Sequence, residues 1–209
     1  VTCIDNNKKI VDQLKKSKVH FYEKGLSKII KKNIQSKNLE FSSSLKPSYF
    51  NSDIIMIAVG TPYKKNGIDL SYIKNCAEEV GLLIQHDKKF RVICVKSTVV
   101  PGTTINFIKN IIEKKSGKKF KKDFGLASNP EFLAEGTAIK DFQNPDRIVI
   151  GIEDAKSKEK MSKLYLKYKN IDKIFTNINT AEIIKYVSNY YLAMNISFSN
   201  EISNMTNIV

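Results

Sequence analysis

The stretch Asp53-Ile-Ile-Met-Ile-Ala-Val59, followed at once by Gly60-Thr-Pro62, decides the fold of this 209-residue chain. A continuous apolar run of this length is typical of a strand buried on both faces of a parallel sheet. The same order returns further on, where a second apolar strand, Arg91–Val95, precedes a loop and a helical pattern over 103–114. Repeated strand–loop–helix units predict an α/β fold with a doubly wound, mostly parallel sheet.

The alternation of strands and helices extends to both sides of this centre. Before it, the sequence predicts a β-rich run over 1–5, two amphipathic helical segments and a minor strand over 39–41. After it, the predicted elements are a strand over 124–127, a polar loop over 129–146, a strand over 147–151, a helix over 155–167 and a strand over 173–175. From about residue 180 the pattern predicts one long helix with apolar residues on several faces. Such a helix packs against a partner subunit or within its own chain.

The composition excludes several classes of protein. With 42% hydrophobic and 27% charged residues, 9 glycines and 5 prolines, the chain is globular rather than disordered or fibrous. It contains no apolar run of the roughly 20 residues that a membrane helix needs, and no secretory signal. Three cysteines at unrelated spacings and two histidines fit neither a disulfide framework nor a zinc site. We therefore expect reduced, buried cysteines, no metal site, no membrane and a cytoplasmic location.

The formal net charge of +14 raises nucleic acid as a partner. Nearly all of this charge is lysine, however, and only Arg91 and Arg147 supply the planar guanidinium that phosphate and base recognition favour. The lysines are also spread along the chain, mostly in pairs. This pattern favours a solvated lysine coat and no nucleic-acid partner. A lysine-rich polyanion-binding module is the alternative from a different class, and it predicts binding that weakens steeply with salt.

Ligands of doubly wound sheets bind beyond the carboxyl ends of the strands, so the loops there are the first places to search. Asp5 closes a strand where the acidic residue of an NAD site binds a ribose hydroxyl, although a helix N-cap explains it equally well. Gly60 would let a ligand approach the backbone. Ser97 and Thr98 offer hydroxyls for a ribose, an amide or a substrate. An ordinary turn and an N-cap remain the alternatives for these two loops.

The loop that follows the strand over 124–127 carries a more specific pattern. Glu131 and Glu135 lie four residues apart, and helical geometry would place both on one face. A glutamate in such a crevice can act as a general base. At the end of the loop we expect Arg147 to pair with Asp146 or Asp141 and to hold the loop in place.

The long helix opens with a second pair of polar residues. Lys185 and Asn189 are four residues apart, so a cation and an amide donor share one face of the helix. Such a pair can hold an oxyanion or a carboxylate. The sequence therefore predicts a base, a cation and a donor that converge above the strand ends.

Taken together, six runs resemble the UDP-glucose/GDP-mannose dehydrogenase family, in family order: Tyr22–Leu26, Val59–Pro62, Lys96–Thr98, Asn129–Asp141, Asn144–Gly151 and Glu182–Asn189. The resemblance implies NAD-dependent oxidation of a nucleotide sugar at C6 from alcohol to carboxylate, through a thiohemiacetal and a thioester on a cysteine. It favours UDP-glucose, oxidised to UDP-glucuronate, as the substrate. A GDP-mannose or UDP-hexosamine dehydrogenase of the same family is the alternative, followed by a dehydrogenase of the β-hydroxyacid type.

The resemblance also assigns roles to residues at matching positions. In catalysis Glu131 would be the acid and base for hydrolysis, Thr98 would position a water, and Lys185 with Asn189 would stabilise the charged oxygen. NAD would contact Asp5, Val59, Gly60, Thr61, Ser97, Thr98 and Glu135. The nucleotide sugar would contact Glu131, Phe132, Leu133, Glu135, Lys185 and Asn189.

The resemblance implies two domains. Residues 1–178 would form an NAD-binding domain of Rossmann type, and residues 179–209 would begin a central helical domain through which the protein forms a homodimer. The first strand and its glycine turn would lie before residue 1, and the nucleophilic cysteine beyond residue 209, because Cys3, Cys76 and Cys94 match no catalytic position. Residues 1–209 alone are therefore expected to bind the cofactor incompletely and to show no turnover.

Overall fold

The computed structural model describes residues 1–45, 51–65 and 67–206, and its centre is a five-stranded sheet in the order β3-β6-β7-β8-β9. The strands are β3 (Ile54–Ile57), β6 (Arg91–Val95), β7 (Phe124–Ser128), β8 (Arg147–Ile152) and β9 (Asp172–Thr176). Neighbouring strands are parallel except for β7 and β8, which run antiparallel. The predicted α/β fold with a mostly parallel sheet is confirmed.

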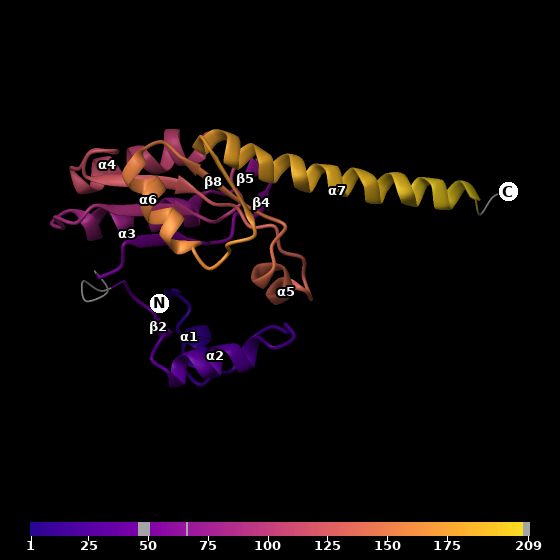
Figure 1. Cartoon of the computed structure of the whole chain (residues 1–209), viewed down its shortest axis with the longest axis horizontal. Coiled ribbons are helices and arrows are strands. Elements are labelled where there is room, and N and C mark those ends of the chain that lie inside the picture. Colours follow the sequence, from indigo (N-terminus) through magenta and orange to yellow (C-terminus); the bar gives the residue numbers. More distant parts are fainter. Residues whose placement is uncertain (46–50, 66, 207–209) are drawn as a thin grey trace.

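Helices cover both faces of this sheet, and one of them extends far beyond it (Figure 1). They are α3 (Ser71–Ile84), the π-helical turn η2 (Thr103–Ile108), α4 (Lys109–Ser116), α6 (Ala155–Leu164) and α7 (Ile178–Thr206). The turn η2 continues directly into α4, so the helix predicted over 103–114 is present but begins more loosely wound. Helices α3, α4 and the first turn of α7 pack on one face, and α6 packs on the other.

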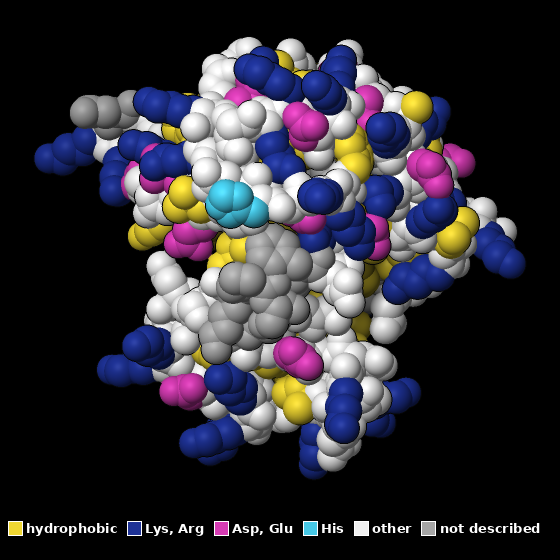
Figure 2. All heavy atoms as spheres, turned by 90° about the vertical axis from the view of Figure 1, so that its left-hand side faces the viewer, with side chains coloured by type: hydrophobic (Ala, Val, Ile, Leu, Met, Phe, Trp, Pro, Cys, Tyr) yellow, Lys and Arg dark blue, Asp and Glu magenta, His cyan; other side chains and the backbone are white. Residues whose placement is uncertain are grey.

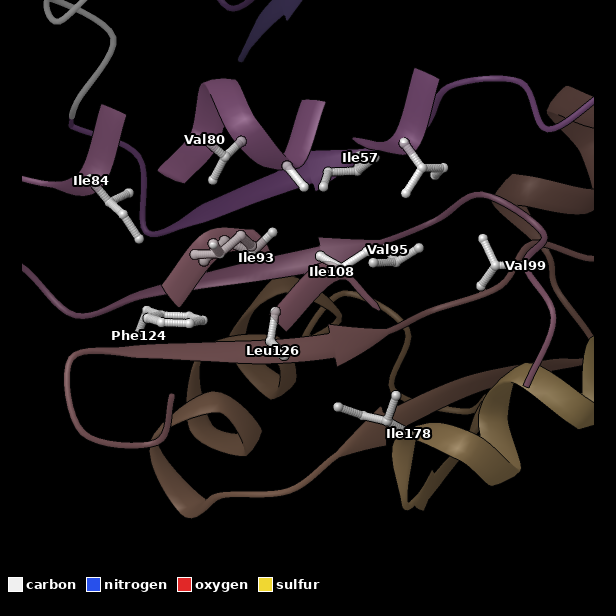
Figure 3. Close-up of a cluster of buried hydrophobic side chains, with 13 residues drawn as sticks. Ile57, Val80, Ile84, Ile93, Val95, Val99, Ile108, Phe124, Leu126 and Ile178 are labelled. Atoms are coloured by element: carbon white, nitrogen blue, oxygen red, sulfur yellow. The ribbon is translucent and has the colours of Figure 1, made fainter. Parts of the chain in front are cut away.

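Side chains alternate along each strand between these two helical layers. On β6, Ile93 and Val95 point toward α3 and η2, whereas Val92 and Cys94 point toward α6. Figure 3 shows the first of these clusters, in which Ile178 of α7 lies at the end of the core formed with β6 and β7. Burying an apolar side chain of this size contributes about 1.5–3 kcal/mol. The long helix is therefore anchored to the sheet by its first turn.

The N-terminal residues form a smaller unit that lies below the main sheet in Figure 1. Its strands β1 (Thr2–Ile4) and β2 (Glu40–Ser42) pair in parallel, and its helices are α1 (Lys8–Lys15) and α2 (Leu26–Gln35). Among the described residues, β1 and β3 each have a strand partner on one edge alone. The unit touches the rest of the chain where the Gly136 N–H donates to Oε2 of Glu23 at 3.1 Å.

Two local predictions differ from the structure. The apolar run at β3 was predicted to be buried on both faces, but Met56 is 42% exposed while Ile57 is buried. The reason is that β3 is the edge strand of its sheet: on the face that carries Met56, Ile54 still packs against the core cluster of α6, but Met56 lies beyond that cover. The loop predicted over 129–146 contains a short helix, α5 (Ala138–Gln143). In addition, β4 (Tyr63–Lys64) and β5 (Gly67–Ile68) pair antiparallel after Pro62.

On the face that Figure 2 shows, charged side chains are scattered rather than gathered in one place. Figure 2 shows lysines and arginines distributed over one face of the molecule, with acidic side chains between them. Several lysines of the chain form ion pairs, as Lys163 does with Glu159 at 2.6 Å. Among the residues that the structure describes, no helix is both long and apolar enough to cross a membrane.

Candidate active site

Loops from the carboxyl ends of β3 and β6 are tied together by side-chain hydroxyls. The Ser97 hydroxyl donates to the carbonyl of Val59 at 2.7 Å, and the Thr61 hydroxyl donates to the carbonyl of Thr98 at 2.8 Å. Between them, Gly60 has no heavy atom within 4 Å of the position that a Cβ would take. These predicted cofactor residues therefore lie side by side, with open space over the glycine.

The loop after β7 and the long helix meet in an ion pair. Nζ of Lys185 lies 3.5 Å from Oε1 of Glu131, and the two side chains are 8% and 35% exposed. The other carboxylate oxygen of Glu131 accepts the N–H of Leu133 at 2.6 Å. Because Lys185 is buried and Glu131 is open on one side, a ligand can reach the carboxylate while the ammonium stays fixed beneath it. The predicted convergence of a base and a cation is present in this arrangement.

Phe132 lies between two cations at the rim of this pair. Its ring centroid is 5.2 Å from Nζ of Lys185 and 4.7 Å from the guanidinium carbon of Arg147. Both distances are within the range of cation–π attraction. The ring therefore links the end of the loop to the start of α7.

The sequence analysis missed a buried polar centre formed by Asn129. Its Oδ1 accepts from Nζ of Lys96 at 3.1 Å and from the Tyr165 hydroxyl, and its Nδ2 donates to the carbonyl of Val149 at 2.8 Å. Burial lowers the pKa of Lys96, and the nearby charge of Glu131 opposes this shift. Burial also raises the pKa of Tyr165 well above its usual range. The position of Lys96 directly after a buried strand was the signal that could have identified it as part of the site.

A cavity of about 260 Å³ opens beside these residues. Its wall includes Lys96, Asn129, Glu131, Phe132, Arg147 and Tyr165. The aromatic rings and charged groups of its wall could contact part of a small molecule.

Other predicted site residues lie outside this cluster. Residues 129–134 are not helical and Glu135 is exposed in a turn, so the prediction that Glu131 and Glu135 share a helix face is wrong. Asn189 is exposed one helical turn beyond Lys185. Leu133, by contrast, lines the same cavity and is 38% exposed. Asp5 is exposed at the end of β1, where its carboxylate accepts the N–H of Asn7 at 2.8 Å.

The predicted pairing of Arg147 with an aspartate is also wrong. Within the described ranges, Arg147 forms no ion pair with Asp146 or Asp141, and its guanidinium packs on Phe132 instead. The carboxylate of Asp141 accepts from the N–H of Ala134 at 3.0 Å and from the Thr137 hydroxyl at 2.9 Å. Local hydrogen bonds at the start of α5 therefore hold the loop.

The three cysteines are free, but they differ in burial. Cys94 is buried, Cys76 is half-buried and Cys3 is exposed, so the expectation that all three are buried is wrong for Cys3. The reason is that β1 belongs to the small N-terminal sheet, which leaves Cys3 open to solvent. Among the described residues, no group of three or more His, Cys, Asp or Glu side chains is placed to hold a metal ion.

Alkylation of the native chain should separate Cys3 from Cys94. Burial raises the pKa of the Cys94 thiol to about 12, and only the thiolate reacts. We expect iodoacetamide to modify Cys3 first and to leave Cys94 unmodified until the chain is unfolded, as measured by peptide mass spectrometry. Chain unfolded in urea is the control, in which all three cysteines should react alike. Modification of native Cys94 as fast as Cys3 would contradict the buried position of β6.

The mostly parallel sheet with helices on both faces is the architecture of a Rossmann-type nucleotide-binding domain, and Glu131 follows the carboxyl end of its strand β7. Residues 1–169 match the NAD binding domain of the UDP-glucose/GDP-mannose dehydrogenase family, and residues 179–209 match its central domain. The chain belongs to this family, and the cofactor of the matching domain is NAD. The resemblance drawn from the motifs is confirmed.

Several relatives and solved structures resemble the chain over its whole length. It is 38% identical to UDP-glucose 6-dehydrogenase of Rhizobium meliloti, over 98% of this chain and 47% of the relative. It is 36% identical to GDP-mannose 6-dehydrogenase of Pseudomonas aeruginosa, over 100% of this chain and 48% of the relative. The chain thus spans about half the length of the curated relatives it matches.

Two solved structures have the same fold. The ternary complex of GDP-mannose dehydrogenase from Pseudomonas aeruginosa matches with a TM-score of 0.92 and 36% identity, over 96% of this chain and 46% of that one. The UDP-glucose dehydrogenase of Pyrobaculum islandicum matches with a TM-score of 0.90 and 37% identity, over 97% of this chain and 46% of that one. These four relatives and structures are named for two different nucleotide sugars, UDP-glucose and GDP-mannose.

Proposed function

We propose that the full-length protein containing these residues oxidises a nucleotide sugar at C6 to the carboxylate with NAD, and that UDP-glucose is the substrate. GDP-mannose is the second candidate, because relatives named for either sugar are similarly identical to this chain. The observation that carries the proposal is the Lys185–Glu131 pair, 3.5 Å apart, beside a cavity of about 260 Å³. It joins the part that matches the NAD-binding domain to the part that matches the central domain.

The chemical roles follow from the charges and their access. Glu131 would take a proton from the water that hydrolyses the thioester, because its side chain is 35% exposed and a water can reach it beside Lys185. Lys185 would hold the negative charge that develops on the substrate oxygen. Asn189, one turn further along α7, would donate to the same oxygen, and Thr98 would position the water. The nucleophilic cysteine would come from the second half of the protein.

The described residues fit the two ends of NAD better than its middle. Asp5 is an exposed carboxylate at the carboxyl end of β1, as binding of a ribose hydroxyl requires. Val59, Gly60, Thr61, Ser97 and Thr98 would surround the nicotinamide end, with open space over the glycine. We assign Glu135 to the cofactor as well, since its exposed carboxylate lies in the loop above the sheet. NAD supplies the hydride acceptor, and these side chains would bind and orient it.

The nucleotide sugar would lie against the loop after β7. We propose that Phe132 and Leu133 line its sugar pocket, together with Glu131, Glu135, Lys185 and Asn189. Phe132 is already held between Lys185 and Arg147, which supports a fixed wall for the sugar ring.

The free cysteines are consistent with the cytoplasmic location that we propose for the protein.

Adding one strand to the chain should test the proposed cofactor domain. Residues 1–178 would form this domain, whose first strand would pair between β1 and β3 and carry a Gly-x-Gly-x-x-Gly turn for the pyrophosphate. We expect a chain extended by such a strand and turn to bind NAD at least about tenfold more tightly than residues 1–209 in calorimetric titration. An extension with alanines in place of the glycines is the control. Equal affinity of all three forms would contradict the proposal.

The outer part of α7 supports a homodimer. Figure 1 shows this helix projecting well beyond the sheet. Its outer turns expose large apolar side chains, among them Tyr190, Leu192, Ile196, Phe198 and Met205. Exposed apolar surface of this extent is typical of a protein–protein interface. We propose that residues 179–209 begin a helical domain whose apolar residues pack against a second copy of the chain.

A further inference from the structure

One buried carboxylate on α7 has no role in the proposed chemistry. Glu182 lies three residues before Lys185 and is 2% exposed. Its Oε2 accepts the N–H of Gly102 at 2.6 Å, and its Oε1 accepts both the N–H and the hydroxyl of Thr104 at 3.0 and 2.6 Å. The carboxylate of one element is therefore bound to the beginning of another that is distant in sequence.

The start of helix η2, which the Glu182 side chain contacts, favours a negatively charged group. Gly102 and Thr104 begin the helix η2, where backbone N–H groups have no partner within the helix and the helix dipole favours a negative charge. Burial raises the pKa of Glu182, and the hydrogen bonds from Thr104 and Gly102 oppose that shift. A buried carboxylate is costly unless it is hydrogen-bonded. These contacts offset that cost and leave a rigid junction.

The junction joins the two walls of the proposed active site. Gly102 ends the loop that carries Thr98, whereas Lys185 follows Glu182 by three residues on the same face of α7. The intervening Ile183 is 47% exposed, while Lys185 is buried. A shift of α7 relative to η2 would therefore move Lys185 relative to both Thr98 and Glu131.

We propose that Glu182 is a positioning residue, which fixes α7 to the start of η2 and thereby holds Lys185 against Glu131. The inference rests on the proposed function for its catalytic meaning, but the positional part does not depend on activity. It predicts that loss of the Glu182 contacts separates Lys185 from Glu131 before it unfolds the sheet.

A zero-length crosslink measures this separation in residues 1–209 themselves. A water-soluble carbodiimide joins an ammonium to a carboxylate in direct contact, so the Lys185–Glu131 pair at 3.5 Å should give a crosslinked peptide by mass spectrometry. We expect Glu182→Gln to lower this yield by about threefold or more, because an amide cannot accept from both N–H groups. Glu79→Gln, on the exposed side of α3, is the matched control and should keep the wild-type yield.

A milder pair of variants keeps the test decisive if Glu182→Gln does not fold. Thr104→Val removes one of the three donors and should lower the yield less, whereas Thr104→Ser keeps the hydroxyl and should restore it. Circular dichroism shows which variants are folded. A wild-type crosslink yield in folded Glu182→Gln, or in Thr104→Val when Glu182→Gln is unfolded, would overturn the proposal.

Kinetics of the full-length protein then separate the two proposals. We expect Glu182→Gln to lower kcat for NADH formation by about tenfold while the KM for NAD changes little, since it displaces Lys185 rather than the cofactor loops. If wild-type protein forms no NADH from any nucleotide sugar, the proposed function fails while the crosslink result still decides the role of Glu182. If wild-type protein is active and kcat of Glu182→Gln is unchanged, the positioning role fails.

Discussion

Replacing Lys185 by alanine in the full-length protein is expected to slow NADH formation from UDP-glucose by about 10²–10³-fold. The ammonium is buried and lies 3.5 Å from Oε1 of Glu131, and its removal would leave the developing oxyanion without the positive charge that stabilises it. Glu131→Gln is expected to cost about 10²–10⁴-fold, because the amide cannot take the proton from the hydrolytic water. The double variant should be little slower than the slower single variant, since the two groups act as a unit.

Lys163→Ala is the matched control for this experiment. Lys163 also forms an ion pair with a glutamate, at 2.6 Å from Glu159, but both side chains are exposed on α6. Its loss should leave the rate within about twofold of wild type, as exposed pairs contribute little. An equal effect of Lys163→Ala and Lys185→Ala, or a Lys185→Ala variant with the wild-type rate, would contradict the assignment of Lys185.

Substituting Gly151 by alanine is expected to destabilise the chain by about 2–3 kcal/mol in urea unfolding. Gly151 lies in β8 directly beneath the start of α7. A Cβ at this position would lie 2.7 Å from both the Cβ of Ala181 and the Cα of Ile178, and 2.9 Å from the carbonyl oxygen of Asn177. Because two of these atoms belong to the backbone, α7 must move away from the sheet to admit a methyl group.

Gly60→Ala controls for the general cost of replacing a glycine. Gly60 follows β3 and has nothing within 4 Å of the added methyl group, so we expect a change within about 0.5 kcal/mol. If Gly151→Ala were no more destabilising than Gly60→Ala, the close packing of α7 on β8 would be disproved. The crosslink between Lys185 and Glu131 should also weaken in Gly151→Ala, because the same helix is displaced.

The sequence predicted the central elements of the fold well, for a physical reason. Strands β6 and β7 are buried on both faces, and their mostly apolar sequences, without a polar residue at every second position, are the strongest signal of a parallel sheet. The edge strand β3 has an equally apolar run, yet Met56 is exposed. Composition cannot tell a central strand from an edge strand, because burial depends on which neighbours arrive from elsewhere in the chain.

Site residues that belong to a local sequence motif could be predicted from the sequence. Site residues whose contacts join distant segments of the chain could be predicted less well. The Asn129–Gly136 run and Lys185 indicated a base and a cation, and the structure places them in contact. The four-residue spacing of Glu131 and Glu135 led to the wrong prediction that they share a helix face, since the loop is not helical there. The contacts of Asn129 and Glu182 arise between distant segments, so no local pattern reveals them.

The site lies where two parts of the chain meet. Glu131 belongs to the part that matches the NAD binding domain, and Lys185 belongs to the part that matches the central domain. Gly151 and Glu182 fix the helix that joins them. The geometry of the proposed active site thus depends on how α7 is seated on the sheet.

The most direct test of this account is NADH formation by the full-length protein, measured by absorbance with UDP-glucose, GDP-mannose and a UDP-hexosamine in turn. We predict turnover with UDP-glucose, with two NADH formed for each sugar converted to its carboxylate, and loss of that turnover in Glu131→Gln. Turnover with GDP-mannose alone would keep the enzyme class and correct the substrate. No NADH from any nucleotide sugar, with NAD and a folded protein present, would contradict the account.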